Sequence, residues 1–179
     1  MIFGLCWKED KAVHQQTEAL DALIHARALW TMRESALQLA VDAATACLVA
    51  GPDNEPLREL AGLPPTTGAF ETGALLEKVF AEFDADYPEL NESDAIVLVL
   101  RHYAHLYMDG SLSARELSAW AHSSIGHEGP SETSPIVEMD DDLDLEDLDI
   151  GRKQVDSTAI VEEFLSATET IATNFRPRL

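Results

Sequence analysis

Residues 5–50 form the longest stretch of this chain without glycine or proline. The stretch is rich in Ala, Leu, Gln, Glu and Arg, which lose little conformational freedom on entering a helix. One helix of that length is unusual in a globular domain, so we expect two helices that break near Thr31, with Thr31 as the cap of the second. In each half the apolar residues recur at helical spacing, so each helix presents one face to a core.

Capping and breaker residues divide the rest of the chain into further predicted helices. Pro56 is suited to the first turn of a short helix, and a longer helix is expected over residues 72–84. Ser113 and Glu116 have the spacing of a capping box and should open a helix that runs to about residue 125. A last helix is expected from about residue 157 to residue 172.

The most apolar segment of the chain covers residues 95–108. Its β-branched residues make a strand conceivable, but residues 93–107 contain no breaker and the later half has helical spacing. We therefore expect a central helix. Ser93 would cap its start, and Asp109 with Gly110 would end it.

Length and composition fit a single folded domain. The chain has 179 residues, 46% of them hydrophobic and 25% charged, and a globule of this size buries roughly 70% of its unfolded surface. We predict an all-α, single-domain bundle of about six to seven helices with an acidic loop or helix near the C-terminus. Its parts are a helical core over residues 1–135, an acidic segment over 136–156, and a C-terminal helix with a short tail over 157–179 that packs on the core.

The charge balance disfavours two classes of partner. The 33 acidic residues against 12 basic ones give a net charge of -21, which repels nucleic-acid phosphates and anionic lipids. No apolar run reaches the roughly 18 residues of a membrane span. We therefore expect no nucleic acid and no membrane as partners, and a basic protein as the best candidate. The alternative is that the charge serves solubility alone.

The N-terminus and the cysteines indicate a cytoplasmic protein. The first seven residues are apolar but lack the basic start of a signal peptide. Cys6 and Cys47 lie far apart and form no C-x-x-C pair, so neither a disulfide framework nor a zinc knuckle is expected.

Residues 136–150 carry eight acidic residues and no basic one. Asp140, Asp142 and Asp144 alternate as in a calcium-binding loop, but the sixth and twelfth positions hold Leu145 and Gly151 instead of Gly and Glu. A dedicated calcium site is therefore not expected. Like charges repel along a helix and the segment offers no countercharge, so the sequence allows either a helix or a loop here.

The same acidic segment is the main candidate for a binding surface. Leucines among aspartates can dock on a partner that has a basic rim around an apolar groove. The alternative is that the leucines cover the protein's own core while the acids face water. The predicted acidic interaction surface consists of Asp140, Asp141, Asp142, Asp144, Glu146, Asp147 and Asp149.

Four histidines and a tryptophan suggest a second candidate site. His102 and His105 are three residues apart on a predicted helix, and two further histidines follow on the next helix and loop. No H-E-x-x-H or zinc-finger spacing is present, so neither a metal nor a cofactor is predicted. Hydrogen-bonded histidines at a helix contact are the alternative. The possible pocket consists of His102, His105, Trp120, His122 and His127.

No catalytic motif is present. The chain has no G-x-S-x-G elbow, no Walker loop and no G-x-G-x-x-G. Cys47 lies in an alanine-rich helical stretch, which indicates packing rather than nucleophilic catalysis.

Several segments in the middle of the chain resemble a loose group of small helical proteins predicted in actinobacterial genomes. They are the R-x-L-A-G-L helix at 58–63, the Tyr-Ala helix from Tyr103 that ends in a Gly turn, and the Trp-Ala-His helix at 120–122 with its Gly-rich loop. The resemblance implies no activity and carries over no functional residue.

Two functional hypotheses follow. The first is a non-enzymatic cytosolic protein-binding module, such as an immunity- or inhibitor-like partner of a basic protein, because an acidic surface can attract and occlude a basic cleft. The second is a ligand- or metal-binding helical protein, or an enzyme, with a histidine-lined pocket between helices. A homo-oligomer that pairs through the N-terminal helices is a further possibility.

Overall fold

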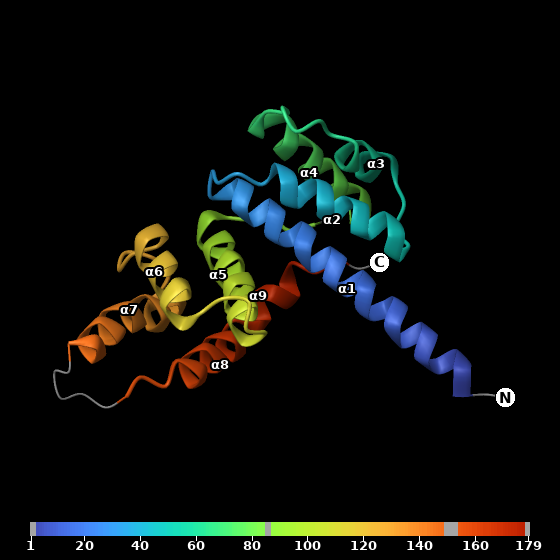
Figure 1. The fold of residues 1–179 in the computed structure, drawn as a ribbon. Coiled ribbons are helices and arrows are strands. Elements are labelled where there is room, and N and C mark those ends of the chain that lie inside the picture. The colour runs from blue at the N-terminus through green and yellow to red at the C-terminus, as the bar shows by residue number, and fades with distance from the viewer. Residues whose placement is uncertain (1–2, 85–86, 149–153, 178–179) are drawn as a thin grey trace. The chain divides into compact units, whose positions relative to one another are not determined.

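All regular structure of the described residues is helical in the computed structural model, which describes residues 3–84, 87–148 and 154–177, with side chains from residue 13 onward (Figure 1). This confirms the predicted all-α class. The chain divides into an N-terminal unit, Met1–Leu90 with Phe175–Leu179, and a C-terminal unit, Asn91–Asn174. None of the described helices combines the length and apolarity needed to cross a membrane.

The N-terminal unit contains α1 (Phe3–Thr31), α2 (Leu37–Ala50), α3 (Glu55–Ala61) and α4 (Ala69–Phe83). Small side chains let α1 and α2 approach closely, and leucines of α3 with larger residues of α4 complete the core. The principal buried residues are Leu23, Ile24, Ala26, Ala40, Ala44, Cys47, Leu57, Leu60, Leu76, Val79 and Phe80.

The break between α1 and α2 differs from the prediction. Thr31 is the last residue of α1, and its hydroxyl donates to the carbonyl of Arg27 at 3.0 Å, so it does not cap α2. The chain turns at Arg33, which adopts a positive φ of 63° while its N–H donates to the Trp30 carbonyl at 2.9 Å. Backbone hydrogen bonds at the end of α1 therefore set the turn, and Ala36 precedes α2 without a side-chain cap.

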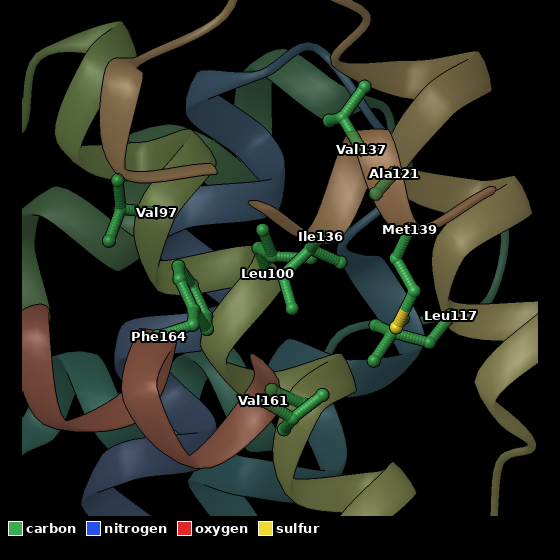
Figure 2. Packing of buried hydrophobic residues seen from close by; sticks show 10 residues of the cluster. Val97, Leu100, Leu117, Ala121, Ile136, Val137, Met139, Val161 and Phe164 are labelled. Atoms are coloured by element: carbon green, nitrogen blue, oxygen red, sulfur yellow. The ribbon is translucent and has the colours of Figure 1, made fainter. Parts of the chain in front are cut away.

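The C-terminal unit contains α5 (Glu92–Met108), α6 (Ala114–Ser124), the 3₁₀ turn η1 (Ser131–Thr133), α7 (Ser134–Asp147), α8 (Ser157–Ala167) and α9 (Glu169–Asn174). Figure 2 shows α5, α6, α7 and α8 meeting in one core. The boundaries predicted at residues 135 and 156 fall inside this unit. Its core residues are Val97, Leu100, Ala104, Leu117, Ala121, Ile136, Val137, Met139, Val161 and Phe164.

Nine α-helices occur in the described residues, against the six or seven predicted. One addition is the split of the C-terminal helix at Thr168, which ends α8 before α9 begins. The capping box is confirmed, with Ser113 and Glu116 each accepting from the other's backbone N–H. The predicted Ser93 cap is wrong, because Asn91 caps α5 by accepting from the Asp94 N–H at 2.9 Å.

Residues after α9 return to the N-terminal unit. The Tyr87 hydroxyl donates to the carbonyl of Phe175, and Arg176 pairs with Asp21 at 3.1 Å. The predicted short tail is therefore anchored at Phe175 and Arg176, while Arg178 lies outside the described residues.

A buried arginine organises the N-terminal unit. The Arg27 guanidinium donates to both carboxylate oxygens of Glu77, at 2.6 and 2.8 Å, and to the carbonyl of Pro88 at 3.2 Å. It also lies over the rings of Phe80 and Tyr87, 5.2 and 5.0 Å from their centroids. Such bidentate and cation–π contacts are strongest when water is excluded.

A second buried arginine, Arg101, organises the C-terminal unit from the middle of α5. It donates to the Leu165 carbonyl in the last turn of α8, to the Thr168 hydroxyl, and to the Glu169 carboxylate. The Thr168 hydroxyl in turn donates to the Phe164 carbonyl at 2.7 Å. A cation at this point satisfies exposed carbonyls and complements the α8 dipole.

Replacing Arg27 should be far more costly than replacing an exposed arginine of the same unit. We expect Arg27→Met to lower the free energy of unfolding by about 2–3 kcal/mol, because it removes several enclosed hydrogen bonds while keeping the apolar stem. Arg58→Met is the control, since Arg58 and Asp53 form a pair that is 60% exposed on both sides, and it should cost less than about 1 kcal/mol. Urea denaturation measures both, and equal losses would contradict the assigned role.

Gly73 lets α4 pass beneath the indole of Trp30, because a Cβ at this position would lie only 2.0 Å from Trp30 Cε2. We expect Gly73→Ala to destabilise the fold by about 1–3 kcal/mol despite the better helix propensity of alanine. Gly68→Ala at the start of α4 meets no atom within 4 Å and should change the stability by less than about 1 kcal/mol. Thermal unfolding followed by circular dichroism checks the difference, and a Gly73→Ala protein as stable as wild type would refute the close approach.

Candidate functional site

The acidic segment forms α7, which packs against α6. Ile136, Val137 and Met139 are buried in the core of the C-terminal unit, and Leu143 packs against that core from its edge. Leu148 has a 66% exposed side chain at the end of α7. The leucines therefore divide between core and surface, while Asp149 and Ile150 of the predicted segment lie outside the described residues.

Arg115 of α6 supplies the countercharge that the acidic segment itself lacks. Its guanidinium donates to the carboxylates of Asp144 and Asp147 and lies 3.9 Å from Asp140. These three aspartates, spaced four and three residues apart, occupy one stripe of α7 and are called the inner row below. The inner row is thus engaged within the protein, which explains how so acidic a segment remains helical.

A tight turn after α6 brings His127 back beside His122. Gly126 takes a φ of +67°, and its N–H donates to the Ala121 carbonyl at 3.2 Å. This left-handed conformation favours glycine and reverses the chain at the end of the helix. The rings of His122 and His127 then lie 5.1 Å apart between centroids, with an angle of 68° between their planes.

Asp140 fixes the orientation of His122. Its Oδ2 lies 3.0 Å from His122 Nδ1, and its Oδ1 accepts a hydrogen bond from the Ser118 hydroxyl, also at 3.0 Å. Both Ser118 and His122 project from α6, so Asp140 connects the two helices. An ionised carboxylate accepts only, so His122 Nδ1 is the donor of this bond.

Asp141 connects the two histidines to the acidic segment. Its carboxylate oxygens lie 3.9 Å from His122 Nδ1 and 3.6 Å from His127 Nε2. The structure therefore unites two residues of the predicted pocket with two of the predicted acidic surface, Asp140 and Asp141. These four residues, His122, His127, Asp140 and Asp141, are called the α6–α7 site below.

The remaining residues of the predicted pocket lie on α5 and α6. Trp120 stacks on Tyr103, with ring centroids 4.2 Å apart, and His102 meets the same Tyr103 ring at 5.9 Å. Burial, together with the nearby His105, lowers the pKa of His102 and keeps it neutral at pH 7. That all five residues line one pocket stays a prediction.

Arg115 and Ser118 are the site residues that sequence reasoning missed. Ser118 lies three residues after Arg115 and four before His122, which places all three on one face of a helix. This polar stripe on α6 was the available signal. The sequence alone does not show which element this stripe contacts, and the structure shows that it is α7.

The N-terminal unit carries two hollows that the sequence did not predict. One of about 460 Å³ lies between α1 and α2 and is lined largely by alanines, among them Ala19, Ala22 and Ala43. The other, of about 550 Å³, lies beside Trp30 and Glu77. Neither gathers nucleophiles or histidines, so the titratable groups with the most specific geometry remain those of the α6–α7 site.

Comparisons with protein-family models, with curated proteins and with solved structures give no match for this chain. The resemblance to actinobacterial helical proteins accordingly stays a prediction. What the protein does must be argued from its charge distribution and from the geometry of the α6–α7 site.

Cys47 should behave as a core residue and not as a nucleophile. Its side chain is fully buried, and burial raises the pKa of the thiol to about 12. In a Cys6→Ser background we expect a disulfide reagent such as DTNB at pH 8 to leave the native protein unmodified and to modify one thiol in urea. Rapid modification of the native protein would contradict the assigned packing.

Proposed function

We propose that this protein is a non-enzymatic protein-binding module, like an immunity or inhibitor protein, and that α7 binds a basic partner protein. The observation that supports it best is the imbalance of charge on α6 and α7. Arg115 is the only lysine or arginine between residues 102 and 151, and it is engaged by the inner row. Neither helix has a second lysine or arginine, so α6 and α7 together keep a large excess of negative charge.

Three of the four acids of α7 outside the inner row form a second stripe. Glu138, Asp142 and Glu146 are spaced four residues apart and are called the outer row below. Glu138 and Glu146 are exposed, and Asp142 is half-buried. A partner could reach the outer row without breaking the Arg115 pairs. Glu146 accepts a hydrogen bond from the Val155 N–H at 3.4 Å, and Asp142 has an interaction within the protein, but a carboxylate has further lone pairs with which to attract basic side chains.

Leu148 supplies an apolar contact next to the outer row. Leu148 is exposed and directly follows Glu146 and Asp147 at the end of α7. An exposed leucine beside carboxylates suits a partner with an apolar groove and a basic rim. The apolar contact adds affinity, and the charges raise the rate of association and the specificity. Residues 91–174 also hold 18 of the 33 acidic residues and only four of the twelve basic ones, so the long-range field favours the same class of partner.

A charge-matched pair of variants tests this proposal. The outer-row variant is Glu138→Gln, Asp142→Asn, Glu146→Gln, and its control is Glu59→Gln, Glu71→Gln, Glu82→Gln, which removes three exposed charges from the N-terminal unit. Both change the net charge from -21 by the same amount. Each protein is immobilised and incubated with extract of the source cells at 50 mM salt, and retained proteins are identified and titrated individually against the purified variants.

The expected result is a basic protein that wild type and the control retain and the outer-row variant loses. In the direct titration the outer-row variant should bind it roughly tenfold more weakly, because each removed ion pair contributes about 0.2–1 kcal/mol. Binding should also weaken as salt rises from 50 to 300 mM. Equal retention by both variants would show that the acidity serves solubility and would overturn the proposal.

A further inference from the structure

We propose that His122, His127 and Asp141 form a binding site for a transition-metal ion of the zinc class. This inference does not depend on the proposed partner binding. One nitrogen from each imidazole and one carboxylate oxygen lie within 4.8 Å of one another, in a single cluster supplied by α6, the turn after it and α7. Two imidazoles and one carboxylate are a common donor set for zinc in proteins.

The spacing of these groups is close to that of a coordination sphere. Ligands that bind zinc tetrahedrally at 2.0–2.1 Å lie about 3.3 Å from one another. The Asp141 carboxylate lies 3.6 Å from His127 Nε2, so this pair needs only a small adjustment. The side chains of His127 and Asp141 are 55% and 54% exposed, so both can move toward an ion without disturbing the core.

Asp140 acts as a positioning residue for the first ligand. By accepting from His122 Nδ1–H it leaves the lone pair on Nε2, and Ser118 holds the other oxygen of Asp140 in place. Nε2 is then the His122 ligand, and since the 3.9 Å contact to Asp141 is made by Nδ1, metal binding requires the His122 ring or the Asp141 carboxylate to move. A carboxylate behind a ligating histidine is the usual arrangement at protein zinc sites, where it orients the ring and raises its basicity. An ordinary surface contact between a histidine and an aspartate does not require this hydrogen-bonded support.

The chemistry of the donors selects the class of ion. Imidazole nitrogens favour zinc and its neighbours, whereas calcium and magnesium prefer sites made only of oxygen atoms. Three protein ligands leave at least one position for water or for a group of another molecule. Because the three ligands come from two helices and their turn, a bound ion would also fasten the end of α6 to α7.

Titration of the full-length protein tests the site. The protein is prepared without a histidine tag, stripped with a chelator and titrated with zinc chloride at pH 7.5 by calorimetry. We expect one zinc per chain with a dissociation constant in the micromolar range, and no heat from calcium or magnesium at the same concentrations. Zinc should also raise the Tm, because an ion that binds only the folded chain stabilises it.

Variants then locate the bound ion. His127→Gln and Asp141→Asn should each weaken zinc binding by tenfold or more, and because both side chains are exposed the metal-free proteins should keep the wild-type Tm. His14→Gln is the matched control: His14 lies 3.1 Å from Glu18 in an exposed pair on α1, and its loss should leave zinc binding unchanged. The outer-row variant, which keeps all three ligands, should bind zinc like wild type.

Two outcomes would overturn the assignment. One is the absence of zinc binding to the stripped wild-type protein up to 100 µM. The other is zinc binding that survives both His127→Gln and Asp141→Asn, which would place the ion elsewhere on this acidic chain. In either case the α6–α7 site would consist of histidine–aspartate contacts without a metal ion.

Discussion

An arginine enclosed by apolar side chains constrains its surroundings more than any single apolar contact, because each of its N–H groups needs an acceptor in a fixed direction. Arg101 obtains two of its acceptors at the junction of α8 and α9, the Leu165 carbonyl and the Thr168 hydroxyl. The end of α8 must therefore lie against the middle of α5, and the core between them closes around Leu100, Val161 and Phe164. Arg27 imposes the same kind of condition on α1 and α4 through Glu77.

Local signals in the sequence predicted most of the helices, and competing local signals account for the errors. The Ser113–Glu116 capping box and the helix over the apolar segment are both confirmed, because few alternatives exist for a reciprocal cap or for so long a run without a breaker. Asn91 and Ser93 are both good caps two residues apart, and the sequence does not say which of them the chain uses. Thr31 bonds back to the carbonyl of Arg27, which is the other common option for a threonine in the last turn of a helix.

The members of the α6–α7 site were predictable, but their association was not. The sequence predicts His122 and His127 in a pocket and Asp140 and Asp141 on a surface, because residue type and spacing describe each segment alone. Their meeting depends on the turn at Gly126 and on the rotation of α7, which its buried residues Ile136 and Val137 determine. The position and rotation of α7 relative to α6 follow from the packing of the whole unit, and patterns in a single sequence do not reveal them.

The two stripes of α7 should have different evolutionary histories. Asp144 and Asp147 share one guanidinium on α6, so a change at either of them alters an internal bond and should be accompanied by a change at Arg115 in diverging sequences. Glu138 and Glu146 are exposed on the same helix, where Glu146 accepts one long hydrogen bond from the Val155 N–H at 3.4 Å. Their identities are less constrained by the fold and can follow whatever molecule the helix meets. One helix of fourteen residues can thus hold a conserved side and a variable side, so that recognition can diversify while the fold stays unchanged.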